Sequence, residues 1–264
     1  MIKIPKKISE KKIKNFFKKR GLFQLIEHHK LTKNNFKYVD RRRDSNPQPP
    51  DLRDLYNLYQ FIVINNRTTV LEFGCGYSSL VMSMALKFNQ KRFKGKKPFE
   101  RCKFPYTLFS IDNQKKYINI AKKRIKKILG KNNNANFFYS SAHMTLFNNN
   151  FAVEYKKLPN VNPDFIYLDG PNQWGVKGKV NNFTTSQEDM MPMSCDILKF
   201  ENYLTPGTII VADGRVSNSL FLKNNFKRNW YFKIDRNNDQ CYFYLKDPYL
   251  GQHNKKQLIF YKKN

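Results

Sequence analysis

The sequence predicts an α/β fold: a doubly wound sheet of seven strands that is mostly parallel and ends in an antiparallel hairpin at its C-terminal edge. Short apolar segments alternate with longer segments in which apolar residues recur at helical spacing, a pattern typical of a parallel sheet covered by helices. The last two apolar segments, 230–234 and 241–245, are separated by only six residues, which suits a hairpin. A turn containing two glycines directly follows the first apolar segment.

Length and composition indicate one main domain. A chain of 264 residues that is 40% hydrophobic can bury one substantial core, so we expect a domain over residues 47–264, preceded by a basic arm, residues 1–46. No apolar run approaches the roughly 20 residues of a membrane-spanning helix, and the lysine-rich start lacks the apolar stretch of a secretory signal. We therefore expect a cytoplasmic protein. The four cysteines have no paired spacing that would indicate zinc or a disulfide framework.

The formal charge of +29 is concentrated in three segments. Residues 1–46 hold 15 basic and 4 acidic residues, 87–103 hold 8 and 1, and 115–131 hold 8 and 0. So basic a surface attracts nucleic acid or anionic lipid. The excess is mostly lysine, in a chain rich in asparagine, isoleucine, phenylalanine and tyrosine, which an AT-rich genome also produces. We therefore favour a solvated basic surface over a nucleic-acid footprint.

The arm places apolar residues among its lysines in a pattern that predicts an amphipathic helix. We expect this helix to pack on the domain rather than on a membrane surface. The proline-rich segment 46–50 breaks helices and is predicted to be a linker, and helical spacing resumes over 51–64.

The domain then follows the alternating pattern in order. The first strand, 69–73, leads through the glycine turn into an apolar helix at 80–86, and the second strand, 107–111, ends at Asp112 before a helix over 117–129. The remaining predicted strands are 136–139, 165–168 and 208–211, with helical segments around 196–203 and 216–225.

Polar and glycine residues gather where these strands end, at the edge where open α/β sheets bind ligands. Gly74 and Gly76 allow the backbone to turn sharply and approach a ligand closely. Asp112 can accept both hydrogen bonds of a ribose diol. Ser141 and Ala142 follow the third strand, where an adenine edge can be met. The pattern suits a nucleotide.

Two familiar nucleotide sites fit poorly. A nicotinamide site favours G-x-G-x-x-G with an acid about 20 residues later, but Ser79 replaces the third glycine and Asp112 lies much farther along the chain. A P-loop needs G-K-S or G-K-T, which is missing here.

Four segments resemble, in order, the motifs of class I S-adenosylmethionine-dependent methyltransferases: 70–76 (VLEFGCG), 111–112 (ID), 164–171 (DFIYLDGP) and 204–213 (LTPGTIIVAD). Together they cover roughly residues 51–245. The resemblance implies a Rossmann-like sheet of seven strands with the last antiparallel, and S-adenosylmethionine as cofactor. By this resemblance Glu72, Gly74 and Gly76 hold the methionine end and Asp112 the ribose. The full predicted cofactor-binding set is Glu72, Gly74, Cys75, Gly76, Ser79, Asp112, Ser141, Ala142 and Asp169.

The methyl acceptor is expected next to Asp169 and Asp213, which end two neighbouring strands. Paired acids there suit a general base or a hard cation. The arrangement resembles the metal-dependent small-molecule O-methyltransferases, which implies Mg2+ bound by Asp169 and Asp213. Gly214 stands where that family carries an asparagine ligand, and Asn172 where it carries a lysine. Trp174 is predicted to line the acceptor pocket, and Arg215 to pair with an acidic acceptor or to form a surface ion pair.

These observations predict an O-methyltransferase with catalytic Asp169 and Asp213, acting on a small hydroxylated molecule or a glycan. One alternative is an RNA or DNA methyltransferase that uses the basic arm. Against it, the lysine clusters at 87–103 and 122–131 are expected on the far side of the sheet, and 169–172 does not resemble an Asn-Pro-Pro-Tyr motif. A second alternative is a non-catalytic binding protein that retains the fold.

Overall fold

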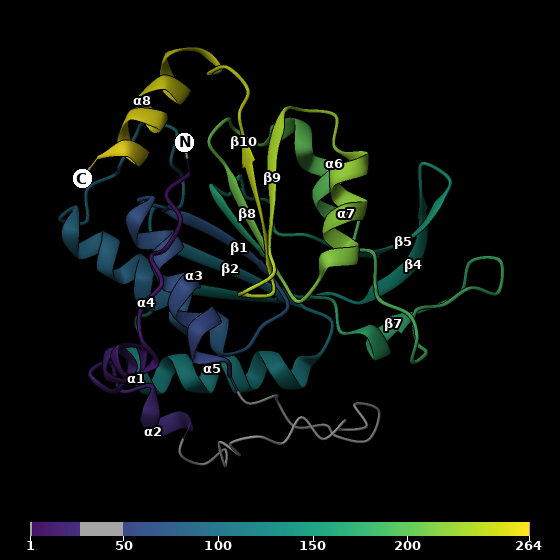
Figure 1. Cartoon of the computed structure of the whole chain (residues 1–264), viewed down its shortest axis with the longest axis horizontal. Coiled ribbons are helices and arrows are strands. Elements are labelled where there is room, and N and C mark those ends of the chain that lie inside the picture. Colours follow the sequence, from purple (N-terminus) through teal and green to yellow (C-terminus); the bar gives the residue numbers. More distant parts are fainter. Residues whose placement is uncertain (1, 27–49, 264) are drawn as a thin grey trace.

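The computed structural model describes residues 2–26 and 50–263, and within these ranges the chain forms a sheet of seven strands in the order β3-β2-β1-β6-β8-β10-β9 (Figure 1). Neighbouring strands are parallel except that β10 runs antiparallel to both β8 and β9. The predicted fold class is confirmed, although β9 rather than the antiparallel β10 forms the outer edge. The strands are β1 (Thr69–Phe73), β2 (Thr107–Asp112), β3 (Ala135–Tyr139), β6 (Phe165–Leu168), β8 (Ile209–Asp213), β9 (Trp230–Asp235) and β10 (Gln240–Leu245).

Helices cover both faces of this sheet (Figure 1). Because side chains alternate along a strand, Val70 packs with α3 and α4 on one face while Leu71 packs with α6 and α7 on the other. Strands buried on both faces read as continuous apolar runs, which is why the sequence shows them clearly. The helices are α3 (Leu52–Ile64), α4 (Tyr77–Arg92), α5 (Lys115–Leu129), α6 (Asp196–Phe200) and α7 (Val216–Asn225), with α8 (Gly251–Lys262) following β10.

The described part of the N-terminal arm packs on the domain. It forms α1 (Glu10–Lys18) and α2 (Phe23–Ile26), and buries Ile13 and Phe17 in the core that α3 and α4 share. The backbone amide of Lys3 donates to Oδ1 of Asn65, and the side chain of Asn65 donates back to the carbonyl of Lys3, both at 2.8 Å. The remainder of the arm and the linker before Pro50 lie outside the described residues, and the domain boundary at residue 46 stays a prediction.

A second, smaller sheet was not predicted. Its strands are β4 (Ala142–Phe147), β5 (Asn150–Tyr155) and β7 (Val176–Lys177), in the order β5-β4-β7. The hairpin β4–β5 stands between β3 and β6, where we expected a loop after the third strand. Its turn, Asn148 and Asn149, has φ values of 47° and 62°, which suits the two-residue turn with left-handed backbone that joins hairpins.

None of the helices in the described ranges is long and apolar enough to cross a membrane.

Candidate functional site

The loops after β1 and β6 touch backbone to backbone at the carboxyl edge of the sheet. Gly74 has φ +87°, and a Cβ added to it would lie 2.9 Å from the backbone of both Asp169 and Gly170. A Cβ added to Gly170 would lie 2.5 Å from the amide nitrogen of Gly74. The amide of Asp169 also donates to the carbonyl of Phe73 at 2.9 Å. Glycine at both positions therefore permits an approach that any side chain would block.

Glu72 lies fully buried beneath this loop. Its Oε1 accepts a hydrogen bond from Ser78 at 2.6 Å, and its Oε2 accepts from Ser79 at 2.5 Å and from Ser110 at 2.6 Å. The hydroxyl oxygen of Ser79 in turn accepts from the amide of Gly76 at 3.1 Å. Burial raises the pKa of Glu72 to about 7. Glu72 thus fastens the loop and the start of α4 to β2, and its direct contact with the methionine end of a cofactor stays a prediction.

Asp112 ends β2 directly beside the glycine loop. Its Oδ2 accepts from the amide of Cys75 at 2.8 Å and from the thiol of Cys75 at 3.3 Å, while Oδ1 accepts from the amide of Gln114 at 2.6 Å. Burial raises the pKa of Asp112 to about 6. The two backbone bonds hold the carboxylate in place. Each carboxylate oxygen offers two lone pairs, so these three bonds leave Oδ1 able to accept one more hydrogen bond.

The segment after β3 places Ser141 and Ala142 differently from each other. Ser141 is half-buried, and its hydroxyl pairs with Nε2 of His143 at 2.8 Å. Ala142 is fully buried at the start of β4, where it is paired with Tyr155 of β5 and Val176 of β7. Of the two, Ser141 is the one whose side chain reaches toward solvent for a ligand contact.

Tyr155 is a site residue that sequence reasoning missed. Its hydroxyl is buried and has no hydrogen-bond partner among the described residues, and a Cβ on Gly170 would lie 2.7 Å from it. The ring lies 5.9 Å from that of Phe73 at the end of β1. No motif contained Tyr155, because it belongs to the unpredicted hairpin. An unpaired buried hydroxyl at the glycine loop is suited to a polar ligand group.

Asp169, Asp213 and Arg215 are brought together at the same edge. Asp169 exposes 53% of its side chain. The pKa of Asp213 is raised to about 7, chiefly by the burial of Asp213 and next by the negative charge of Asp169. The hydroxyl of Tyr167 donates to Oδ2 of Asp213 at 3.0 Å. Nη2 of Arg215 donates to the carbonyl oxygens of Asp169, at 2.7 Å, and Pro171, at 3.0 Å, and its Nε lies 3.8 Å from Oδ1 of Asp169.

The residues present do not fit a Mg2+ site. In the part of the chain that the structure describes, no group of three His, Cys, Asp or Glu side chains is placed to share a metal. The guanidinium of Arg215 lies beside Asp169, so the carboxylate faces a cation already. Mg2+ requires six oxygen ligands in near-octahedral geometry, and Gly214 adds no side-chain oxygen. The expected binding of Mg2+ by Asp169 and Asp213 is therefore not supported.

Trp174 lies half-buried on a short 3-10 turn, η1 (Gln173–Gly175), whose position is fixed by the loop after β2. Oδ1 of Asn113 accepts from the amide of Asn172 at 3.0 Å, and its Nδ2 donates to the carbonyl of Asn172 at 3.1 Å. A Cβ on Gly175 would lie 2.7 Å from Nδ2 of Asn113. The turn that carries Trp174 thus lies against the residue next to Asp112, a contact that sequence spacing did not reveal.

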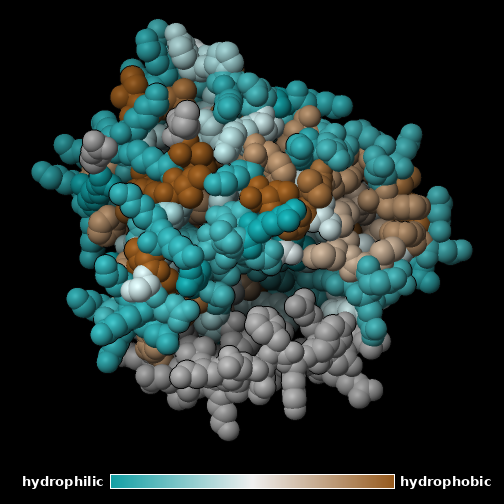
Figure 2. All heavy atoms as spheres, viewed as in Figure 1, coloured by the Kyte–Doolittle hydropathy of each residue, from teal (hydrophilic) through white to brown (hydrophobic). Residues whose placement is uncertain are grey.

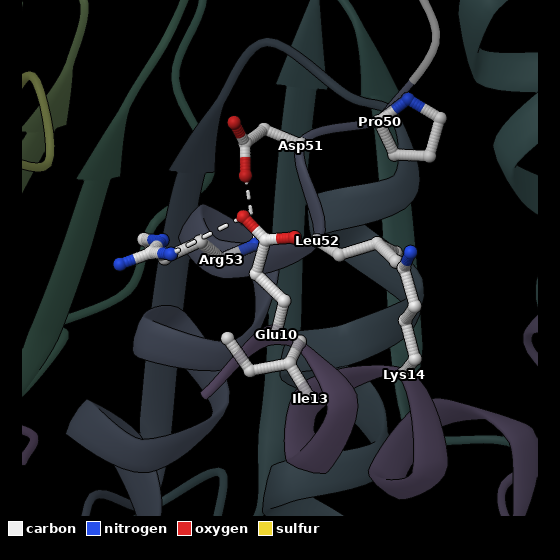
Figure 3. Close-up of a pocket in the computed structure, with 7 residues that line it drawn as sticks. All are labelled: Glu10, Ile13, Lys14, Pro50, Asp51, Leu52 and Arg53. Atoms are coloured by element: carbon white, nitrogen blue, oxygen red, sulfur yellow. Dashed lines mark hydrogen bonds and ion pairs between the residues drawn. The ribbon is translucent and has the colours of Figure 1, made fainter. Parts of the chain in front are cut away.

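A cavity of about 230 Å³ between α1 and the start of α3 contains none of the predicted site residues (Figure 3). Its polar groups bind one another: Asp51 accepts from the amides of Arg53 and Asp54 as the N-cap of α3, and the guanidinium of Arg53 lies 3.7 Å from Glu10. We assign it no role in the site.

Comparison with known proteins gave matches only among solved structures. No protein-family model matches the sequence, and no curated protein matches it. Three solved structures resemble the fold: a putative caffeoyl-CoA O-methyltransferase from Staphylococcus aureus (12% identity, 88% of this chain and 100% of that chain, TM-score 0.40), an O-methyltransferase from Bacillus cereus in complex with SAH (10%, 91% and 92%, 0.38), and precorrin-6y C5,15-methyltransferase from Geobacter metallireducens GS-15 (12%, 67% and 77%, 0.35). These identities and TM-scores are too low to support a conclusion about function.

Proposed function

We propose that this chain is an S-adenosylmethionine-dependent methyltransferase that methylates a hydroxyl group of a small molecule or a glycan. The observation that carries the proposal is the contact between the Gly74 and Gly170 backbones, with the carboxylate of Asp112 and the unpaired hydroxyl of Tyr155 beside it. Because neither glycine has a side chain, the two loops lie backbone to backbone at the edge where such sheets bind ligands. Asp112 and Tyr155 offer an acceptor and a donor of hydrogen bonds beside them.

The residues present fit this cofactor. Asp112 would hold the ribose hydroxyls, the backbone from Gly74 to Gly76 would lie along the ligand, and the hydroxyl of Tyr155 would meet one of its polar groups. Glu72 would act indirectly, by holding in place the glycine loop that contacts the cofactor. When bound, S-adenosylmethionine supplies a methyl carbon on a sulfonium sulfur, whose S–C bond breaks as the acceptor's O–C bond forms, leaving S-adenosylhomocysteine.

The acidic pair would handle the proton of the acceptor hydroxyl. Asp169 is the more exposed acid, so its carboxylate would accept this proton, and the guanidinium of Arg215 lies next to it. Asp213, with a pKa of about 7 and a hydrogen bond from Tyr167, provides a second carboxylate poised near neutral pH. No step requires a metal ion.

The test separates cofactor binding from turnover. Asp169→Ala should lower the turnover number by about 100-fold or more, because a positioned general base typically contributes that much, with S-adenosylmethionine affinity kept. Turnover is read as S-adenosylhomocysteine release with a panel of hydroxylated acceptors, and affinity by calorimetry. A chelator should leave the wild-type rate unchanged. Full activity in Asp169→Ala would remove this residue from the mechanism.

The nucleic-acid alternative is less well supported by the geometry. α4 and α5 both start at the carboxyl edge and run away from it, and the ammonium group of Lys87 near the end of α4 donates to the carbonyl of Leu129 at the end of α5, at 3.0 Å. The lysines that follow these points therefore gather at the opposite edge from Asp112 and Asp169. Binding of RNA that weakens steeply with salt and places the RNA at Asp169 would favour the alternative.

A non-catalytic binding protein is the third possibility. It would retain the sheet and the packed glycine loop, since these also hold the fold together, without needing an exposed Asp169 beside Arg215. A chain that binds S-adenosylmethionine and releases no S-adenosylhomocysteine with any acceptor class would support it.

A further inference from the structure

A second cavity has a volume of about 260 Å³, and its lining contains none of the predicted site residues. It lies between the hairpin β4–β5, the segment 183–193 and the start of α7. Most of its lining is apolar and flexible: Met144, Phe151, Ala152, Phe183, Met190, Met191 and Met193, with Thr185, Asp189 and Ser217 as the polar members. Figure 2 shows hydrophobic side chains gathered over β4 and β5, at the right of the view. We name this space the methionine cavity.

Backbone contacts hold the walls of the methionine cavity in place. The amide of Val153 on β5 donates to the carbonyl of Met193 at 2.8 Å, and the side chain of Asn218 on α7 exchanges two hydrogen bonds of 3.1 Å with the backbone of Ser194. The rings of Phe151 and Phe183 stack at 4.4 Å with an angle of 4°. The cavity is therefore bounded by fixed elements of the fold, while the methionine side chains that fill its surface can adapt to a ligand.

Two connections place this cavity next to the proposed site. Ser217, in its lining, follows two residues after Arg215, whose guanidinium lies beside Asp169. The hydroxyl of Ser186 donates to the carbonyls of Gln173, at 3.3 Å, and Val176, at 3.2 Å, which joins the 183–193 wall to the turn that carries Trp174. The elements that line the cavity are thus connected to those that carry Trp174 and Arg215.

Thr185 supplies a second, independent observation. It lines the methionine cavity, only 4% of it is exposed, and its hydroxyl has no hydrogen-bond partner among the described residues. A buried hydroxyl without a partner costs roughly 1–3 kcal/mol, so such groups in native proteins are usually paired, often with a ligand. Thr185, together with Asp189 and Ser217, therefore gives the largely apolar wall a small number of hydrogen-bonding groups.

We propose that the methionine cavity binds a hydroxylated aromatic group of one or two rings, which, if the proposed function holds, belongs to the methyl acceptor. The volume is just below the roughly 300–1,000 Å³ of sites for drug-sized ligands, so the group is small. Methionine and phenylalanine side chains contact aromatic faces and edges favourably. A sugar ring is disfavoured because the three polar residues of the lining are too few to pair all of its hydroxyls. The cavity thus separates the two acceptor classes that the sequence left open.

The test uses 2-naphthol as the probe, with its fluorescence as the readout, and does not depend on turnover. Wild-type protein should bind 2-naphthol and should not bind glucose. Ala152 is a buried residue of β5 that lines the cavity, so Ala152→Leu should fill part of the cavity and weaken 2-naphthol binding at least ten-fold. The matched control Leu146→Ala, an exposed residue of the same hairpin outside the lining, should bind as wild type does.

Thr185→Val keeps the size and shape of the side chain and removes its hydroxyl. This variant tests the proposal even if Ala152→Leu does not fold. Affinity for 2-naphthol should fall about five-fold while that for naphthalene stays unchanged, as expected for one lost hydrogen bond. Absence of 2-naphthol binding in the wild type, or equal affinity in the wild type and in either folded variant, would overturn the proposal. Calorimetry with S-adenosylmethionine on the same samples keeps the two proposals apart. Loss of cofactor binding would count against the methyltransferase alone, and loss of 2-naphthol binding against the cavity alone.

Discussion

The contact between Gly74 and Gly170 predicts a graded response to alanine substitution. An alanine at Gly170 meets the amide nitrogen of Gly74 at 2.5 Å and the hydroxyl of Tyr155 at 2.7 Å, so the two loops must separate. We expect this to cost about 1–3 kcal/mol, the usual range for overpacking. At Gly74 the same kind of clash, at 2.9 Å, adds to the strain of a side chain at φ +87°, so the cost rises to roughly 2–5 kcal/mol.

Gly178 provides the matched control for strain without a clash. Its φ is +76°, and no described atom lies within 4 Å of an added Cβ, so Gly178→Ala should cost roughly 1–2 kcal/mol. Urea unfolding gives the three free energies, and calorimetry gives the affinity for S-adenosylmethionine. We expect both Gly74→Ala and Gly170→Ala to lose cofactor affinity and Gly178→Ala to keep it. A Gly170→Ala variant with wild-type stability and wild-type affinity would refute the reasoning.

Three further predictions concern stability and order. Burial raises the pKa of Glu72 and of Asp196 to about 7, so between roughly pH 4 and 7 the native chain binds more protons than the unfolded chain. The free energy of unfolding should therefore fall as pH rises through this window. Measured by urea unfolding at several pH values, it should depend less on pH in Glu72→Gln than in the wild type. Phe17→Ala removes a fully buried ring from α1 and should cost about 3–5 kcal/mol in the same assay, whereas a loss below 0.5 kcal/mol, the size of an ordinary surface substitution, would show that α1 is not part of the core. Asn113→Ala removes the hydrogen bonds to Asn172 and should speed amide exchange around Trp174, and unchanged exchange there would contradict the contact.

The sheet was predictable from sequence because its strands are buried on both faces. Residues 165–168 form a continuous apolar run, residues 69–73 are apolar apart from Thr69 and Glu72, and the predicted bounds of both segments match β6 and β1. The helix over 216–225 was also placed at the bounds of α7. The helix predicted at 80–86 was too short, because only the apolar middle of the helix is visible in the sequence pattern. In the structure α4 extends over Tyr77–Arg92 and takes in the first residues of the basic segment 87–103.

The hairpin β4–β5 was missed because its pattern is half-exposed. Along β4, buried Ala142 and Met144 alternate with more exposed residues, which is the signature of a strand covered on one face. The pair Asn148-Asn149 was an available turn signal, since asparagine tolerates the left-handed backbone. Read without it, the segment looked like a loop leading from the third strand.

The residues of the candidate site likewise fall into those that the sequence predicted and those that only the structure revealed. Asp112 and Asp169 were predictable because each directly follows a strand, and strand ends meet at one edge of a parallel sheet. Tyr155 and Thr185 lie on elements whose position depends on tertiary packing, so their unpaired hydroxyls became apparent only in three dimensions. The place of Arg215 beside Asp169, which argues against Mg2+, likewise depends on a contact between residues 46 positions apart.

The central claim is that S-adenosylmethionine binds at the edge of the sheet formed by the glycine loop and Asp112, and calorimetric titration of the wild type and of Asp112→Ala tests it most directly. The wild type should bind one equivalent, and the variant should bind at least ten-fold more weakly, because hydrogen bonds to a charged carboxylate are worth roughly 1.5–3 kcal/mol. No heat of binding with the wild type, or equal affinity in a folded Asp112→Ala variant, would contradict the account.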